Sequence, residues 1–216
     1  MEPFVTHRGK IAVLNWSDVN TDLIIPARYL KRVERTGYGP LLFADKRYEP
    51  GSAPSPDDPN HHGTEAGEFP LNHPSAKEAT ILVVGKNFGC GSSREHAVWA
   101  VAQAGFRAVV APGIGEGFAD IFEGNALNNG LLPIELPEQD WKALAAAGGW
   151  EATIDLSRQT ITLHQGQEPS FAFEIPEETR QRLLNGLDAI AETLRYDNAI
   201  REYEQNTPFW AKTSAG

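Results

Sequence analysis

Cysteine is nearly absent from this sequence of 216 residues, in which Cys90 is the only one. A single cysteine excludes an intrachain disulfide framework. One thiolate also cannot hold an iron–sulfur cluster, which needs several cysteine ligands. If the reaction of this protein requires such a cluster, another chain must supply it.

Long apolar runs and clusters of basic residues are missing too. No stretch approaches the roughly 18–20 consecutive apolar residues of a membrane span, and the first residues lack the charged-then-apolar pattern of a signal peptide. We therefore expect a cytoplasmic protein without membrane contact. The 19 Lys and Arg residues are outnumbered by 29 Asp and Glu residues, which gives a net charge of −10. This balance argues against a nucleic-acid partner, and an anionic substrate would have to be bound by local arginines.

Size and composition predict one globular domain over residues 1–204, followed by a polar tail over residues 205–216. Residues 49–75 are rich in proline and glycine and show no periodicity, so they are expected to form a long loop. Such a loop can be a mobile cover for a site or a passive insertion. His61 and His62 lie within it, but without a third ligand at a set spacing a solvated pair is favoured over a metal site.

Strands and helices are expected to alternate along the middle of the chain. Short apolar runs predict strands at residues 10–14, 81–84, 106–111 and 131–136, and helical stripes lie between the last three. This order predicts an α/β fold with a mainly parallel sheet and crossover helices. A short helix ending at residue 147, antiparallel strands at residues 151–154, 160–163 and 171–175, and a helical region over residues 177–204 should follow. We expect this last region to pack on the sheet and on a partner.

The chain is organised around the glycine-rich stretch that follows the strand at residues 81–84. Ser92 and Glu95 have the spacing of a capping box, which predicts a helix from this point to Gly105. Free N–H groups and the helix dipole would favour an anion over the loop that contains Gly89, Cys90 and Gly91. A cation in the first helical turn opposes the dipole, so Arg94 at that place indicates a use, such as bidentate binding of a carboxylate. Otherwise, Ser92 only caps the helix and Arg94 is a solvated charge.

Residues 87–97, Asn-Phe-Gly-Cys-Gly-Ser-Ser-Arg-Glu-His-Ala, resemble the signature of the swivelling domain of the aconitase superfamily. In this form they are most similar to the small subunits of 3-isopropylmalate dehydratases. Further similar patches lie at residues 20–32, 69–74, 118–122 and 128–133. The resemblance covers residues 10–204 and implies the family fold, a β/β/α swivelling domain with added antiparallel strands.

The resemblance also implies a function. It is the interconversion of 2-isopropylmalate and 3-isopropylmalate in leucine biosynthesis, by dehydration to isopropylmaleate and rehydration. A 4Fe–4S cluster on a large subunit would assist the leaving hydroxyl, with this chain binding no metal and joining a heterodimer or larger assembly. The alkoxide of Ser92 would be the base. The implied substrate-binding residues are Ser93, Arg94, Arg32, Thr21 and Asp22, with Lys31 and Arg35 as rivals of Arg32.

Other readings remain open from the sequence. A related hydro-lyase subunit, for homoaconitate or methylmalate-type acids, would share every motif. A dinucleotide-binding unit is suggested by Gly113 and Gly115 after a strand and by Glu135 about 20 residues on, although Phe118 occupies the third glycine position. A non-catalytic anion-binding domain is a third possibility. A calcium loop at Asp18 is disfavoured because the glycine and terminal glutamate of that motif are missing.

Overall fold

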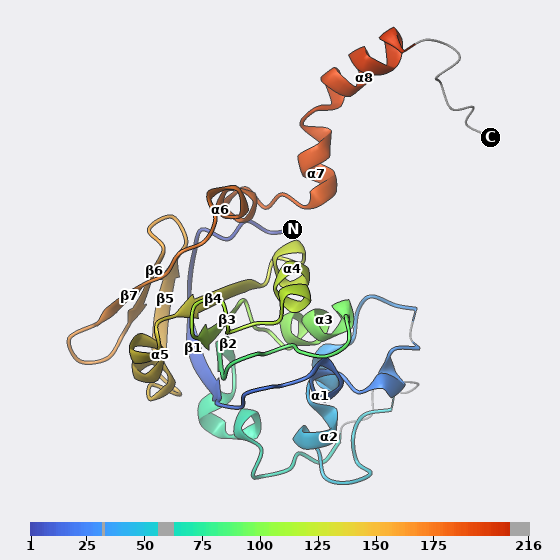
Figure 1. The fold of residues 1–216 in the computed structure, drawn as a ribbon. Coiled ribbons are helices and arrows are strands. Elements are labelled where there is room, and N and C mark those ends of the chain that lie inside the picture. The colour runs from blue at the N-terminus through green and yellow to red at the C-terminus, as the bar shows by residue number, and fades with distance from the viewer. Residues whose placement is uncertain (32, 56–62, 208–216) are drawn as a thin grey trace.

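The computed structural model describes residues 1–31, 33–55 and 63–207. One seven-stranded sheet forms its centre, with the order β4-β3-β2-β1-β5-β6-β7 (Figure 1). β1 to β4 are parallel, and β5 to β7 are antiparallel to their neighbours. The strands are β1 (Thr6–Leu14), β2 (Ala79–Val84), β3 (Ala108–Pro112), β4 (Leu132–Leu136), β5 (Glu151–Asp155), β6 (Thr160–Leu163) and β7 (Ser170–Ala172). The predicted α/β class is confirmed.

Short helices follow β1, and longer ones alternate with the parallel strands. They are α1 (Thr21–Ile24), α2 (Ala44–Arg47), α3 (Glu95–Gln103), α4 (Asp120–Asn128) and α5 (Glu138–Ala145). Gly105 follows the end of α3 and has a positive φ of +105°, so it terminates the helix as the sequence predicted. The described part of the chain contains no helix whose length and apolar content would suffice to span a bilayer.

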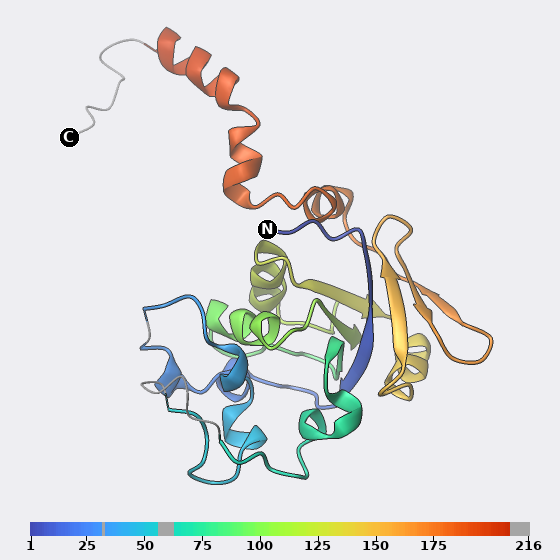
Figure 2. The ribbon, with the colours of Figure 1, turned by 180° about the vertical axis from the view of Figure 1, so that it is seen from behind.

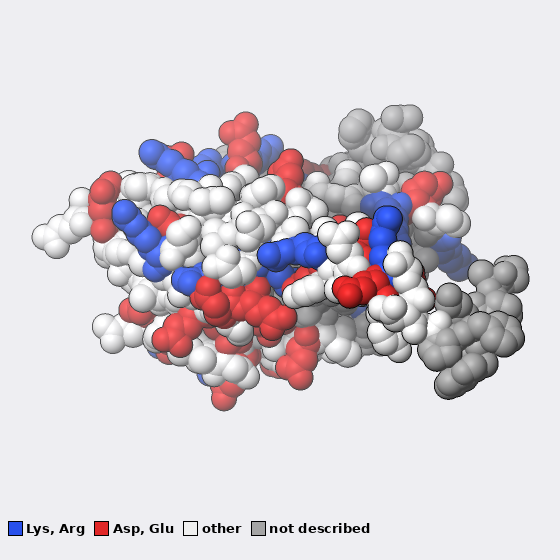
Figure 3. All heavy atoms as spheres, turned by 90° about the horizontal axis from the view of Figure 1, so that it is seen from above, with Lys and Arg blue, Asp and Glu red and all other residues white. Residues whose placement is uncertain are grey.

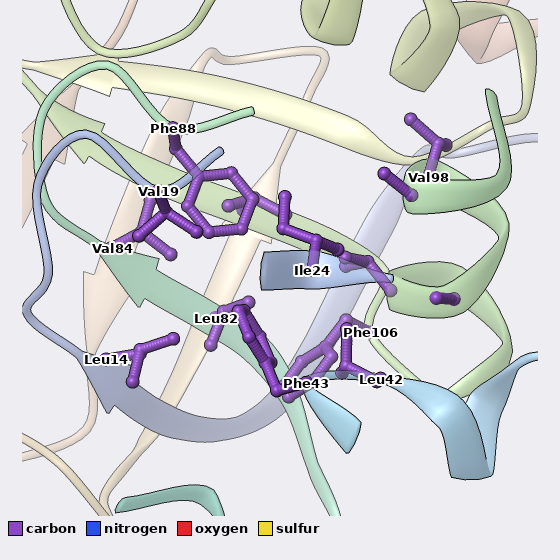
Figure 4. Close-up of a cluster of buried hydrophobic side chains, with 14 of the residues drawn as sticks. Leu14, Val19, Ile24, Leu42, Phe43, Leu82, Val84, Phe88, Val98 and Phe106 are labelled. Atoms are coloured by element: carbon purple, nitrogen blue, oxygen red, sulfur yellow. The ribbon is translucent and has the colours of Figure 1, made fainter. Parts of the chain in front are cut away.

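The alternation of side chains along the buried strands divides the interior into two cores. Leu82 and Val84 of β2 face the core beneath α1 to α4, and Ile81 and Val83 face the other core. Figure 4 shows the first core, where Phe43 and Phe88 lie among aliphatic side chains from the sheet and α3. The second core is covered by α5, whose Trp141 donates a hydrogen bond to the carbonyl of Val84 at 2.9 Å.

The C-terminal region differs from the single packed region expected over residues 177–204. It forms three helices, α6 (Glu177–Leu184), α7 (Ala189–Leu194) and α8 (Asp197–Asn206). Leu183 of α6 is buried in the second core, and α7 and α8 extend away from the sheet (Figures 1 and 2). The expected packing on the sheet is therefore wrong for α7 and α8, because Gly186, at φ +64°, turns the chain after α6.

The proline-rich stretch over residues 49–75 is anchored at both ends where it is described. The N–H of Glu49 donates to the carbonyl of Thr64 at 2.8 Å, and Asn72 donates through its side chain to the carbonyl of Arg47 at 2.6 Å. Two short 3₁₀ helices, η3 (Pro70–Asn72) and η4 (Pro74–Ala76), complete it. His61 and His62, in the middle of this stretch, lie outside the described residues.

Candidate active site

The glycine-rich loop between β2 and α3 leads into the helix later than the sequence predicted. α3 begins at Glu95, and its N-cap residue is Arg94, which is extended at φ −141° and ψ 103°. The capping box of Ser92 and Glu95 is therefore wrong, since no side chain caps α3 and Ser92 lies two residues before the cap. The Ser92 hydroxyl is left available for another role.

Ser92 and Ser93 are exposed at the end of this loop. Within the part of the chain that the structure describes, the N–H groups of Gly91, Ser92 and Ser93 have no hydrogen-bond acceptor. They precede the N-terminus of a nine-residue helix, where the dipole adds positive potential. This arrangement suits a bound carboxylate or a transient alkoxide.

Two glycines give the loop its shape. Gly89 and Gly91 have φ values of +80° and +88°, which residues with a Cβ atom rarely adopt. A Cβ atom on Gly89 would lie 2.3 Å from the Phe122 ring of α4, so this backbone packs directly against an aromatic side chain. The loop is thus fixed by close packing as well as by its conformation.

We expect Gly89→Ala to lower the free energy of unfolding by about 2–4 kcal/mol, because it adds left-handed strain to a clash with a buried ring. Gly166→Ala is the matched control: Gly166 also has a positive φ, +61°, but open space around it. The control should cost only about 1 kcal/mol. Urea unfolding of both variants measures the difference, and equal losses would contradict the close packing at Gly89.

The segment after β1 runs alongside the glycine-rich loop and holds it. Asn20 and Cys90 form an isolated parallel bridge, and the N–H of Thr21 donates to the carbonyl of Cys90 at 2.9 Å. The hydroxyl of Thr21 donates to the carbonyl of Ser92 at 2.7 Å. Thr21 is only 2% exposed, so its hydroxyl is used within the chain rather than on the open surface. The hydroxyl of Thr21 therefore makes an internal contact, and the substrate contact expected for Thr21 from the sequence stays a prediction.

An ion pair joins the same two segments at the surface. Arg94 donates from Nη1 to Oδ1 of Asp22, and the Arg94 side chain is 16% exposed against 52% for Asp22. The structure therefore brings together Asp22, Ser92, Ser93 and Arg94, as the sequence predicted for one site. The guanidinium has five N–H donors in all, so donors remain for a substrate carboxylate.

The three rival cations have different positions. Arg32 lies outside the described residues, and Lys31 beside it is exposed. Arg35 lies over the Trp99 ring of α3 at 5.7 Å, and its carbonyl accepts a hydrogen bond from Gln103 at 2.7 Å. Arg35 is thus in contact with α3, and Arg32 as the second arginine stays a prediction from the sequence.

The pKa values of Cys90 and His96, two titratable groups near the loop, are shifted toward their neutral forms. Burial, and then the charge of Asp18, raise the pKa of the Cys90 thiol, so this thiol is not poised as a nucleophile at neutral pH. Burial also lowers the pKa of His96 in the first turn of α3, where its ring packs 4.7 Å from Trp99. The described residues contain no group of three or more His, Cys, Asp or Glu side chains that could hold a metal ion.

The second glycine loop, which suggested dinucleotide binding, is already filled by a side chain. The Glu135 carboxylate accepts hydrogen bonds from the N–H of Gly115 at 2.5 Å and of Gly117 at 2.8 Å. Those donors would have to bind the pyrophosphate of a dinucleotide, and a carboxylate in their place repels it. The hypothesis of a dinucleotide-binding unit at Gly113 and Gly115 is therefore wrong. Instead, the carbonyl of Gly117 accepts from Phe88 at 2.9 Å, so this loop supports the one that carries Ser92.

Sequence reasoning missed the contacts that fix the site. Nothing in the pattern around Thr21 indicated that its hydroxyl would reach Ser92, 71 residues away. The sequence places Glu135 only in a possible dinucleotide-binding unit, whereas in the fold it organises the loop behind Phe88. Only the Asn20 side chain, which caps α1 by accepting from Leu23 at 2.8 Å, had a local signal, since asparagine before a short helix is a typical N-cap.

Known proteins match this chain over nearly its whole length. The sequence model of the aconitase C-terminal domain matches residues 1–139. The 3-isopropylmalate dehydratase small subunit of Bacillus licheniformis is 46% identical over 97% of this chain and 98% of its own length. The chain belongs to the family of 3-isopropylmalate dehydratase small subunits. A second family member, from Bacillus pumilus, is 45% identical over 98% of this chain and all of its own.

A solved structure supports the same membership. The crystal structure of 3-isopropylmalate dehydratase from Methanocaldococcus jannaschii matches 92% of this chain and 98% of its own, with a TM-score of 0.62 and 28% identity. The resemblance predicted from residues 87–97 is thus confirmed. The aconitase C-terminal domain match includes β1 to β4 and the whole site, whereas β5 to β7 and the last three helices lie beyond it.

Proposed function

We propose that this chain is the small subunit of a 3-isopropylmalate dehydratase in the cytoplasm and supplies the base and a carboxylate-binding site for that reaction. The observation that carries the proposal is the meeting of Ser92, Arg94 and Asp22 beside N–H groups without an acceptor in the described chain. Family membership supplies the reaction class. The substrate is a small 2-hydroxy dicarboxylic acid.

Binding would begin with the carboxylates. Arg94 offers its remaining guanidinium donors, and Ser93 offers its N–H and hydroxyl at the start of α3. Asp22 orients Arg94 through their ion pair, which keeps the fork in one geometry before the substrate arrives. Arg32 is proposed as the second carboxylate ligand.

The proton step falls to Ser92. Dehydration removes a proton from one carbon and hydroxide from its neighbour, and rehydration adds them back with the positions exchanged. A serine hydroxyl is a weak base, so its alkoxide must be stabilised by the local N–H groups, the α3 dipole and the charge of Arg94. Ser92 then takes the carbon-bound proton and returns it to the adjacent carbon of the isopropylmaleate intermediate.

A 4Fe–4S cluster does not fit the donor set of this chain. Its only cysteine, Cys90, has its thiol pKa raised by burial, and several thiolates are needed. We therefore assign the cluster to a large subunit, the partner to which the name small subunit points. The Lewis acid for the leaving hydroxyl would come from that partner.

A related hydro-lyase would act on an acid with a different side group. Reconstituted enzyme should have its highest kcat/KM with 2-isopropylmalate, compared with methylmalate-type and homoaconitate-type acids. The assay follows the absorbance of each unsaturated intermediate. A higher kcat/KM for another acid would assign the chain to that related enzyme.

We expect Thr21→Val to lower kcat in the reconstituted enzyme by about tenfold with little change in KM. The change keeps the shape but removes the hydrogen bond to the Ser92 carbonyl, so the base loses its position while the carboxylate ligands remain. Thr21→Ser retains a hydroxyl and should recover most of kcat. Equal kcat in Thr21→Val and the wild type would remove the positioning role.

A further inference from the structure

Exposed apolar side chains gather on the last two helices. We define the arm as residues 188–206, which contain α7 and α8 and extend away from the sheet (Figure 1). Of the large apolar side chains that are exposed in the described chain, half lie here. They are Ile190 at 72%, Leu194 at 61%, Tyr196 at 65%, Ile200 at 39% and Tyr203 at 75% exposure. So high a concentration marks an interaction surface.

The spacing of these residues forms a stripe along α8. Ile200 and Tyr203 are three residues apart on one face of α8, and Tyr196, the N-cap residue, precedes Ile200 by four residues. Asn198 and Gln205 lie on the opposite face by the same geometry. No residue of α8 is buried within the described chain, so the stripe has no cover in this subunit.

Helices this short need support from outside. α7 has six residues and α8 has ten, below the roughly 12–15 that an isolated helix needs for stability in water. Local contacts help: Asp188 caps α7 by accepting from Ala191 at 2.7 Å, and Arg201 pairs with Asp197 at 2.8 Å. Such contacts are weak at the surface, which makes burial of the stripe the main source of order.

A second copy of the chain is a poor cover. A pairing of two α8 helices would be only about 15 Å long and about 10 Å wide, far less area than the roughly 1,200 Å² of a stable interface. The arm is also acidic, with five carboxylates and two arginines, so two arms repel each other. The carboxylates are Asp188, Glu192, Asp197, Glu202 and Glu204. From the side on which the arm lies, acidic and basic side chains intermingle without a large basic area (Figure 3).

The large subunit can cover the arm with a sufficient interface area, because it would also contact the rest of this chain. The small subunits named above align with 97–98% of this chain, which includes most or all of the arm. We propose that the arm docks on the large subunit, with Ile200 and Tyr203 in an apolar groove whose rim is basic. The inference rests on the proposed function, since that supplies the large subunit.

Two double variants with the same added charge test the inference. Ile200→Asp with Tyr203→Asp changes the stripe, and Asn198→Asp with Gln205→Asp changes the opposite face of α8. Each is mixed anaerobically, as the full chain, with the large subunit from the same genome, and Kd is measured by sedimentation. Thermal melts of each variant alone should agree, because all four side chains are exposed.

The stripe variant should raise Kd at least about tenfold, since full burial of one large apolar side chain is worth that factor. The control should stay within about threefold of the wild type. If both variants bound the large subunit with equal Kd while the wild-type mixture was active, the docking inference would be wrong and the proposed function would stand. If the wild-type chain associated with itself and the stripe variant did not, the stripe would bind a second copy of this chain, and docking on the large subunit would be wrong. If wild-type chains neither bind nor hydrate isopropylmaleate with the cluster intact, the proposed function fails, and the inference with it.

Discussion

Ser92→Ala is expected to lower kcat for hydration of isopropylmaleate by at least about 100-fold, with assembly unchanged. A positioned general base contributes about 10²–10⁴-fold, and Ser92 is one of the two exposed serines at the end of the glycine-rich loop. Its carbonyl still accepts from Thr21 after the change, so the loop keeps its shape. The measurement is the initial rate in the reconstituted enzyme at saturating substrate.

Ser157→Ala is the control for this result. Ser157 is exposed in the turn between β5 and β6, on a different part of the fold. It should retain the wild-type kcat. A Ser92→Ala enzyme within about threefold of the wild type would remove Ser92 as the base and leave it as a loop residue.

Arg94→Lys is expected to lower kcat/KM by at least about tenfold, or ~1.4 kcal/mol. Lysine keeps the charge and can pair with Asp22, but it lacks the planar fork that binds a carboxylate through two parallel hydrogen bonds. The loss should appear in both the isopropylmalate and isopropylmaleate directions, because both ligands carry the same carboxylates. Steady-state kinetics of the reconstituted enzyme measure it.

Arg158→Lys is the matched exchange at a site without function in this account. The Arg158 side chain is 83% exposed and pairs only loosely with Asp155, at 3.8 Å. Its kcat/KM should equal that of the wild type. If Arg94→Lys also stayed within about twofold, the bidentate role of Arg94 would be contradicted.

Periodicity and turn chemistry predicted most of the fold. Apolar runs located β2, β3 and β4 to within two residues, because buried parallel strands are recognisable as continuous β-branched stretches. The β-hairpin strands β5 and β6 were located as well. The start of α3 was misplaced by about two residues, because Ser92 and Glu95 imitate a capping box that the extended backbone of Arg94 prevents.

Long-range contacts of the site could not be predicted from local pattern. The ion pair of Arg94 with Asp22 joins residues 72 positions apart, and it depends on how β1 and β2 lie side by side. The role of Glu135 was misjudged for the same reason. Its position about 20 residues after the glycines matched a dinucleotide-binding unit, and only the fold shows its carboxylate within the glycine loop. The family resemblance predicted that the segments of Asp22 and Arg94 share one site, whereas local sequence patterns did not.

The most direct test of the central claim is the ultraviolet absorbance of isopropylmaleate, followed under anaerobic conditions with three preparations. They are this chain alone, the iron–sulfur large subunit alone, and the two mixed. We predict loss of absorbance in the mixture only, since the base and the cluster lie on different chains. Hydration by either chain alone, or none in a mixture whose chains are bound and whose cluster is intact, would contradict the account.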